Sequence, residues 1–163
     1  MSRHIPQNPT FIAPPNPHLS QSCSLPLLAG RHALVTGANG GIGEAICQAL
    51  AHHGARVTLL GRKSVELENV GARLPGSGHG IAVADHAAVA QAIESAVSAR
   101  GLIDLLICNA GAASSAPFTS TQPAAWQSML DVNLTGTYNC IFAVLPGMIK
   151  AGWDRIVNVA STR

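Results

Sequence analysis

The sequence predicts a three-layer α/β sandwich, in which a parallel sheet of five strands lies between two layers of helices. Two observations lead to this fold class. Short apolar runs alternate along the chain with longer segments that repeat apolar residues every three or four positions, the spacing of an amphipathic helix. The short runs are apolar at nearly every position, which indicates strands that are covered on both faces of the sheet.

The first predicted strand, His32–Thr36, runs directly into a glycine-rich turn and then into a helix. Gly37, Gly41 and Gly43 follow the strand with the spacing Gly-x-x-x-Gly-x-Gly. Such glycines permit a sharp exit from the strand, a close approach of the backbone to a pyrophosphate, and tight packing of a helix whose first amides face the anion. An ordinary strand-to-helix loop is the alternative interpretation of this turn.

The other elements follow in alternation. Further strands are predicted at residues 56–60, 81–85, 105–108 and 155–159, and helices at 42–52, 64–73, 86–100 and from Pro123 onward. Three helices carry apolar stripes that we expect to face the sheet. The stripes are Ile42, Ile46, Cys47 and Leu50; then Val89, Ile93 and Val97; then Trp126, Met129, Leu130, Leu134, Ile141 and Leu145.

Composition limits the function classes. The 163 residues suit one domain, predicted at 27–163 behind a proline-rich tail, 1–26, that is expected to be disordered. A net charge of +2 with 11% charged residues gives no basic field for nucleic acid. No uninterrupted apolar run is long enough to predict a membrane span. The four cysteines lack metal-site spacing, so we expect no metal and a reduced, cytoplasmic setting.

Four motifs occur in a fixed order: Thr36–Gly43, Asn109-Ala110-Gly111, Asn133 within a helix, and residues 156–161. Together they resemble the short-chain dehydrogenase/reductase family, over residues 27–163. The resemblance implies a Rossmann-type sheet with strand order 3-2-1-4-5. It also implies an NAD(P)-dependent oxidoreductase that interconverts an alcohol and a carbonyl on a small molecule, most often a 3-oxoacyl-thioester reductase.

The resemblance also assigns site residues. Asn109 would tie the sheet together, and Val83 would offer its backbone beside the adenine. Asn133 would hold a water in a proton relay, although a satisfied core asparagine is the alternative. Ser161 would hydrogen-bond the substrate oxygen. The implied cofactor-binding residues are Thr36, Gly37, Asn39, Gly41, Ile42, Gly43, Arg62, Val83, Asn109, Ala110 and Gly111.

The end of the second strand favours NADP over NAD. Folds that prefer NAD place a carboxylate there for the ribose 2′-hydroxyl, whereas NADP-preferring folds supply an arginine. Here the segment reads Gly61-Arg62-Lys63, with two cations that suit a 2′-phosphate. NAD stays possible, because many NADP-preferring relatives carry a basic residue within the turn and Ala38-Asn39-Gly40 has none.

The family's catalytic tyrosine and lysine would lie beyond Ser161, and the sequence stops at Arg163. Tyr138 does not match that motif, so we interpret it as structural. The chain is therefore expected to be truncated after its fifth strand, with an exposed apolar edge at 156–159, and to be inactive alone. The alternatives are a non-catalytic dinucleotide-binding module and an interaction remnant, since relatives form homo-oligomers through the helix that carries Asn133.

Overall fold

The computed structural model describes residues 27–62, 64–74, 79–82 and 86–161. The predicted tail at 1–26, the loop at 75–78 and the strand exit at 83–85 lie outside the described residues. The elements are β1 (His32–Thr36), α1 (Gly41–His52), β2 (Arg56–Gly61), α2 (Ser64–Ala72), β3 (His79–Ala82), α3 (His86–Arg100), β4 (Leu105–Cys108), the 3₁₀ turn η2 (Phe118–Ser120), α4 (Pro123–Leu130), the π-helical turn η3 (Asp131–Thr135), α5 (Gly136–Ala151) and β5 (Arg155–Asn158).

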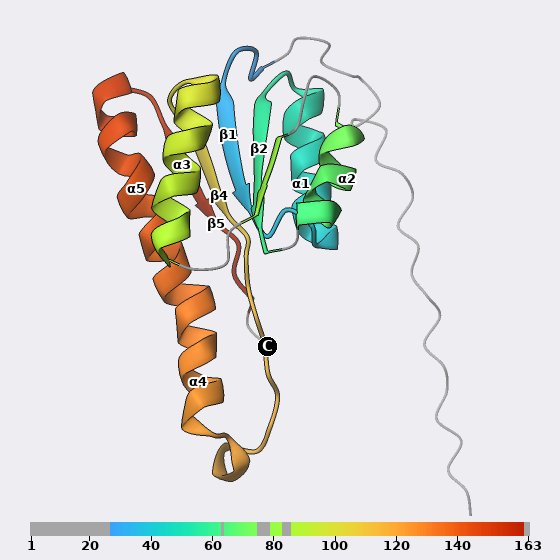
Figure 1. Cartoon of the computed structure of the whole chain (residues 1–163), viewed down its shortest axis with the longest axis vertical. Helices are drawn as coiled ribbons and strands as arrows, with labels where there is room; N and C mark the ends of the chain where they lie inside the picture. Colours follow the sequence, from blue (N-terminus) through green and yellow to red (C-terminus); the bar gives the residue numbers. More distant parts are fainter. Residues whose placement is uncertain (1–26, 63, 75–78, 83–85, 162–163) are drawn as a thin grey trace, which may run out of the picture.

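The sheet is parallel, and its strand order is β3-β2-β1-β4-β5, as predicted (Figure 1). β1 lies at the centre, where Val35 pairs with Leu59 on one side and with Ile107 on the other. The chain first builds the sheet outward from β1 through β2 to β3. It then crosses back to β4 and β5, so the order reverses between β1 and β4. This is a Rossmann-type fold.

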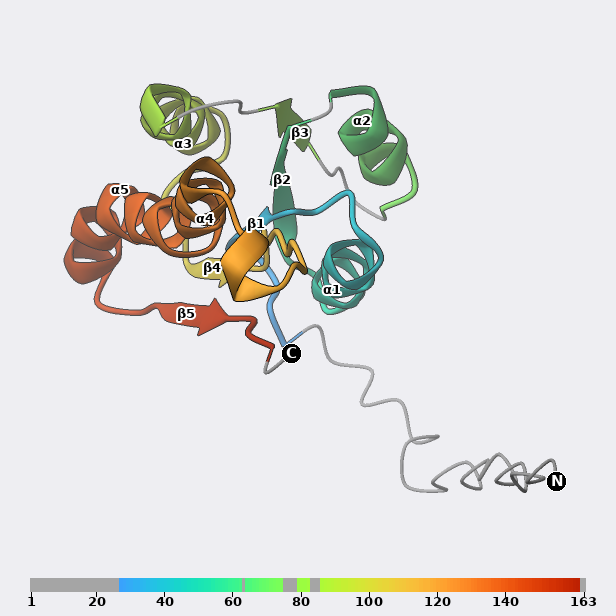
Figure 2. The same ribbon diagram turned by 90° about the horizontal axis from the view of Figure 1, so that it is seen from below.

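Helices cover both faces of the sheet. Figure 2 shows α1 and α2 on one side and α3 with α5 on the other. Alternate residues of β1 supply the two cores: Ala33 and Val35 pack with α1 and α2, whereas Leu34 packs with α3 and α5. All five residues of β1 are buried, which explains why the run carries no alternating polar residues.

α1 packs on the sheet by part of the predicted stripe. Cys47 is buried, and Ile46 and Leu50 are half-buried against the same core. The prediction for Ile42 is wrong, because its side chain is 65% exposed. Ile42 lies in the first turn of α1, next to the carboxyl end of β1. This turn lies beyond the end of the strand, so it does not cover the face of the sheet. The helix terminates before Gly54, whose φ of 88° requires glycine.

The long helix differs from its prediction. Its buried residues include Cys140, Val144 and Met148, one every four positions. Trp126, Leu134 and Leu145 from the predicted stripe are exposed, whereas Ile141 does pack against the core. Two features explain the difference: η3 inserts a wider turn that shifts the helical register, and α4 projects beyond the sheet (Figure 1).

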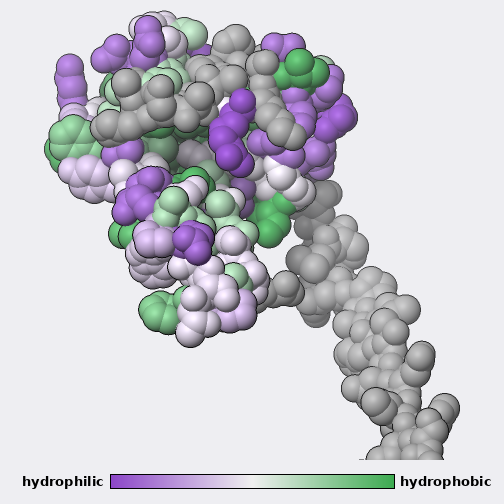
Figure 3. All heavy atoms as spheres, turned by 60° about the horizontal axis from the view of Figure 1, so that its bottom comes forward, coloured by the Kyte–Doolittle hydropathy of each residue, from purple (hydrophilic) through white to green (hydrophobic). Residues whose placement is uncertain are grey.

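α4, η3 and α5 form one continuous helix, Pro123–Ala151. This helix is long and apolar enough to cross a membrane by length and composition, although polar residues interrupt its apolar sequence. One such helix is weak evidence for a span, since core helices of soluble proteins pass the same test. Its projecting end, with the loop before it, shows mostly pale, weakly polar surface with green at the tip (Figure 3).

β5 forms one edge of the sheet, beside β4. Val157 and Val159 are 47% and 42% exposed, as expected for an edge without a helix on that face. Ile156 differs from the expectation, because it packs against the core beneath α5. Figure 2 shows α5 on one face of β5 and no helix on the opposite face.

Candidate functional site

The carboxyl ends of β1 and β4 lie side by side, since the two strands are paired and parallel. This is the position at which the strand order reverses. In open α/β sheets such a switch point leaves a crevice at the carboxyl ends of the strands, and ligands bind there. The glycine turn after β1 and the Asn109-Ala110-Gly111 segment after β4 both begin at this switch point.

A buried hydroxyl joins these two segments. Thr36 Oγ1 accepts hydrogen bonds from the backbone amides of Asn109 and Ala110, each at 2.9 Å. The same hydroxyl faces the carbonyl oxygen of Ile107 at 3.4 Å, to which it donates. Thr36 is 7% exposed, so the hydroxyl that joins the two segments is itself buried.

A second connection uses a side chain from the β4 end, that of Asn109. Its Nδ2 donates to the carbonyl oxygens of Thr36 and Gly37, each at 3.2 Å. The end of β4 therefore holds the first residues of the glycine turn by side-chain and backbone bonds together. This is the tie across the sheet that the family resemblance implied for Asn109.

The three glycines of the turn have different surroundings. Gly37 has a φ of 62°, and a Cβ placed on it would lie 2.8 Å from Ala110 Cα. A Cβ on Gly43 would overlap the carbonyl oxygen of Gly37 and lie 2.9 Å from Ala38 Cα. A Cβ on Gly41 would meet nothing within 4 Å. Packing therefore requires glycine at 37 and 43, whereas position 41 faces open space.

This open space suits an anionic group. The N-cap of α1 is Gly40, which has no side chain with which to cap the helix. The first amides of any helix have no partner inside it, and they carry the positive end of the helix dipole. Gly41 leaves room for close approach to those amides, so the residues present fit the pyrophosphate of a dinucleotide.

Asn39 reaches from the same turn toward β2 and α2. Its Nδ2 donates to Glu66 Oε2 at 2.6 Å, and its Oδ1 would lie 2.9 Å from a Cβ placed on Gly61. Arg62 follows Gly61 and is exposed, while Lys63 lies outside the described residues. Glu66 was not predicted to contact this turn, because its one signal in the sequence is that of an acidic residue in the first turn of a helix.

Asn133 lies in the π-helical turn η3 and pairs with a backbone segment after β4. Its Nδ2 donates to Ala112 O at 2.8 Å, and its Oδ1 accepts from Ala112 N at 3.0 Å. The side chain is exposed and not buried as the stripe suggested, because α4 and η3 extend past the sheet. A π-helical turn is frequent at functional sites.

The remaining predicted residues are not joined to this network. Ser161 is exposed beyond the end of β5, and the hydrogen bonds of the described part of the chain include none from Ser161 to Asn133. Val83 lies outside the described residues. Tyr138 is exposed on α5, where its ring stacks on Phe142 with centroids 5.9 Å apart.

The buried cysteines are ordinary thiols. Burial raises the pKa of Cys108, beside Asn109, to about 11. Burial, with a smaller effect from Cys108, raises the pKa of Cys140 to about 12. At neutral pH both stay protonated, so neither is an activated nucleophile. No cluster of metal-ligating side chains occurs among residues with described positions.

The sheet order and the glycine turn at its switch point define a Rossmann-type α/β protein. A family model described as short chain dehydrogenase matches residues 31–163. The chain belongs to the short-chain dehydrogenase family, a family of oxidoreductases.

Curated relatives agree with this assignment. The chain is 40% identical over 139 residues to D-threitol dehydrogenase of Mycolicibacterium smegmatis, covering 82% of this chain and 54% of that protein. It is 35% identical over 140 residues to an uncharacterised oxidoreductase of Staphylococcus saprophyticus, covering 82% of this chain and 60% of that protein. The chain thus spans a little over half the length of these relatives.

Solved structures show the same fold. A metagenomic short-chain oxidoreductase in complex with NADP superposes with a TM-score of 0.76 at 34% identity, covering 83% of this chain and 64% of that one. A 3-oxoacyl (acyl-carrier-protein) reductase from Agrobacterium tumefaciens, with NADP bound, gives a TM-score of 0.77 at 34% identity, covering 84% and 55%.

Proposed function

We propose that the chain binds a nicotinamide dinucleotide, with NADP preferred and NAD possible, as part of an oxidoreductase that interconverts an alcohol and a carbonyl. The observation that carries this proposal is the glycine turn, which Thr36 and Asn109 hold in place while the space before Gly41 stays open. The similar metagenomic oxidoreductase and the similar reductase from Agrobacterium tumefaciens support it, since both hold NADP on the same fold.

Each part of the crevice would contact a different portion of the dinucleotide. The pyrophosphate would lie against Gly41 and the amides of Ile42 and Gly43. The adenosine ribose would lie near Ala110 and Gly111, and a 2′-phosphate would reach Arg62. The Val83 backbone contact with adenine stays a proposal from the family resemblance. When bound, the nicotinamide supplies hydride exchange with carbon.

Asn133 and Ser161 would serve the substrate end. The Ser161 hydroxyl would donate to the substrate oxygen. Both polar atoms of the Asn133 side chain already bond Ala112, so its main effect is to position the Gly111–Ala112 segment. One N–H of Nδ2 would still be available to a water of the proton relay.

The substrate class is proposed to be a 3-oxoacyl thioester. The similar reductase from Agrobacterium tumefaciens supports this class. The similar D-threitol dehydrogenase supports a polyol as the second candidate. A comparison of acetoacetyl thioester with D-threitol as substrates of the complete enzyme distinguishes the two classes. We also propose a cytoplasmic setting, with no nucleic-acid or membrane partner.

Calorimetric titration of the 163-residue chain with NADP and with NAD tests the proposed binding. We expect saturable binding of one dinucleotide per chain. Gly41→Ala should abolish it while the chain stays folded. Binding that Gly41→Ala leaves unchanged, or no binding by the parent chain, would contradict the proposal. Turnover of a carbonyl substrate by the same chain would contradict the expectation that it is inactive alone.

Self-association is a second candidate role, favoured by one observation. Leu134 of η3 and Tyr138, Phe142, Leu145 and Ile149 of α5 are exposed at three- and four-residue spacing, so they form one apolar stripe along the continuous helix. We propose that this stripe joins copies of the protein, as relatives are expected to do. Sedimentation of the parent chain and of Phe142→Glu measures the effect, and equal association of both would exclude this stripe.

A further inference from the structure

The turn after β1, the end of β2 and the first turn of α2 meet at one side chain, Asn39. Its Nδ2 lies 2.6 Å from Glu66 Oε2, a short, charge-assisted hydrogen bond. Asn39 is half-buried, so this bond is partly shielded from water. Glu66 is thereby held toward the glycine turn and not toward open solvent.

The fit at Gly61 fixes the same side chain from the other direction. A Cβ on Gly61 would lie 2.9 Å from Asn39 Oδ1 and 3.2 Å from Leu67 Cδ2. The absence of a side chain at the end of β2 therefore leaves the space that the Asn39 amide occupies. With one amide atom against Gly61 and the other bonded to Glu66, Asn39 has a single supported orientation.

The end of β2 is where a dinucleotide-binding fold reads the 2′ position of the adenosine ribose. A carboxylate there accepts a hydrogen bond from a 2′-hydroxyl, and it repels a 2′-phosphate. The strand end itself supplies Gly61 and Arg62 and no acid. The carboxylate of Glu66, four residues past Arg62, is held toward this corner by its bond to Asn39.

We propose that Glu66, positioned by Asn39, is a specificity-determining residue that opposes Arg62 at the adenosine 2′ position. The inference rests on the proposed dinucleotide function and deepens it. Arg62 attracts the phosphate of NADP, whereas Glu66 weakens that preference and offers an acceptor to the ribose hydroxyl of NAD. The chain consequently discriminates less between the two dinucleotides than Arg62 alone would dictate.

Glu66→Gln tests the charge without removing the contact, because the glutamine oxygen still accepts a hydrogen bond from Asn39. Titration with NADP and NAD gives the ratio of the two dissociation constants. We expect the variant to shift this ratio about tenfold toward NADP, the effect of deleting one nearby negative charge in a partly solvated site. Glu68→Gln is the matched control, an exposed acid on the same helix, and should shift the ratio less than about twofold.

Asn39→Ala tests the positioning role and leaves the charge of Glu66 in place. We expect a shift in the same direction, since the freed carboxylate turns toward solvent. In the double variant with Glu66→Gln, the shift should equal that of Glu66→Gln alone, because both changes act on one contact.

The outcomes are distinct. A parent chain that binds neither dinucleotide overturns the proposed function and this inference with it. A parent chain that binds, with a ratio that Glu66→Gln and Asn39→Ala both leave unchanged, overturns this inference alone and makes the contact a structural tie. A shift equal in Glu66→Gln and Glu68→Gln also overturns it, because net charge would then explain the effect.

Discussion

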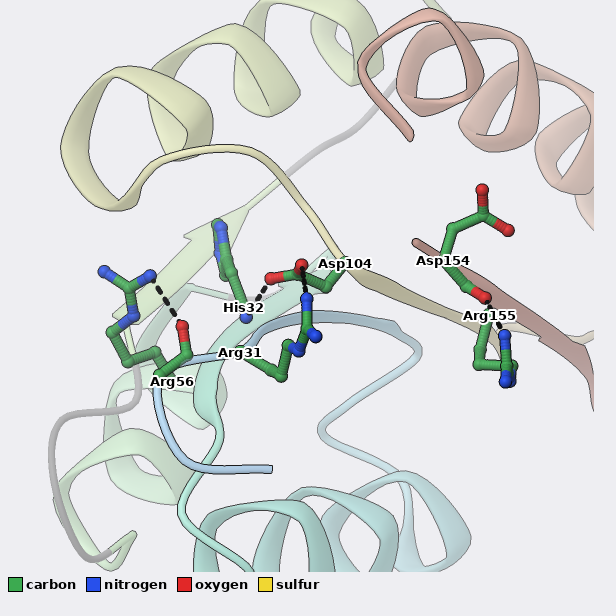
Figure 4. Close-up of polar contacts among 7 residues, drawn as sticks. Arg31, His32, Arg56, Asp104, Asp154 and Arg155 are labelled. Atoms are coloured by element: carbon green, nitrogen blue, oxygen red, sulfur yellow. Dashed lines mark hydrogen bonds and ion pairs between the residues drawn. The ribbon is translucent and has the colours of Figure 1, made fainter. Parts of the chain in front are cut away.

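The imidazole of His32 is hydrogen-bonded to the hydroxyl of Thr58, with 2.9 Å between Nε2 and Oγ1, so β1 and β2 are joined by buried side chains. The other ring nitrogen, Nδ1, lies 2.9 Å from the carbonyl oxygen of Gly101. A carbonyl only accepts, so Nδ1 carries the proton and Nε2 accepts from Thr58. Figure 4 shows His32 beside Asp104, whose carboxylate accepts from the His32 backbone amide and pairs with Arg31.

This arrangement predicts a loss of stability in acid. Burial, with smaller effects from the nearby charges of Arg56 and Arg100, lowers the pKa of His32 below 6.5, although Gly101 and Asp104 act in the opposite direction. The unfolded chain therefore binds the proton first, and the free energy of unfolding falls as the pH drops below the unfolded value. We expect the melting temperature to decrease as the pH is lowered from 7.5 to 5.5.

Melting temperatures of the parent chain and of His32→Gln across this pH range check the prediction. The variant should lose part of the pH dependence, since a glutamine does not titrate. His52→Gln is the control, because His52 is exposed on α1 and should leave the slope unchanged. Parallel curves for the parent and His32→Gln would contradict the assignment.

The second prediction separates folding from binding within the glycine turn. In Gly43→Ala the new Cβ would overlap Gly37 O and crowd Asn109 Nδ2 at 2.9 Å, which we expect to destabilise the fold by about 1–3 kcal/mol. In Gly41→Ala the new Cβ meets nothing within 4 Å, and alanine is the better helix former, so stability should be unchanged or higher.

Denaturant unfolding and dinucleotide titration on both variants make the comparison. Gly41→Ala should stay folded and lose binding, because the added methyl occupies the space proposed for the pyrophosphate. An equal loss of stability in the two variants would contradict the assignment of Gly43 to packing and of Gly41 to binding.

The third prediction concerns the hydroxyl that joins the ends of β1 and β4. Thr36→Val keeps the shape of the side chain and leaves the amides of Asn109 and Ala110 without an acceptor. A buried amide left without a partner costs about 1–3 kcal/mol, and these two bonds are part-buried, so we expect the free energy of unfolding to fall by about 1–3 kcal/mol. Thr137→Val is the matched control, because the Thr137 hydroxyl donates to Asn133 O on an exposed helix surface, and it should cost under about 0.5 kcal/mol.

The elements of this fold that a local pattern determines could be predicted from the sequence. Apolar runs such as Leu105–Cys108 are buried strands because a parallel sheet covered on both faces favours apolar residues at successive positions. The glycine turn was also predictable, since only a few arrangements of glycine allow a strand to exit into a tightly packed helix. The strand order came from the family resemblance and is confirmed.

The failures concern contacts between distant segments. Nothing in the stripe that begins at Trp126 indicates the π-helical turn that changes its register, or that α4 extends past the sheet. The partner of Asn133 is the backbone of Ala112, which has no side-chain signal. Glu66 looks like an ordinary first-turn acid until α2 is placed beside the turn that holds Asn39.

The fourth prediction tests cofactor preference at Arg62. Arg62→Asp replaces an exposed guanidinium at the end of β2 with the carboxylate that NAD-preferring folds place there. A carboxylate repels a 2′-phosphate and accepts a hydrogen bond from a 2′-hydroxyl, so NADP affinity should fall at least about tenfold while NAD affinity holds or rises. Arg155→Asp is the control, because it makes the same charge change at the start of the edge strand β5, on the other side of β1. It should lower NADP affinity less than about twofold. Titration of both variants with both dinucleotides decides the matter, and unchanged selectivity in Arg62→Asp would exclude Arg62 from the 2′-phosphate site.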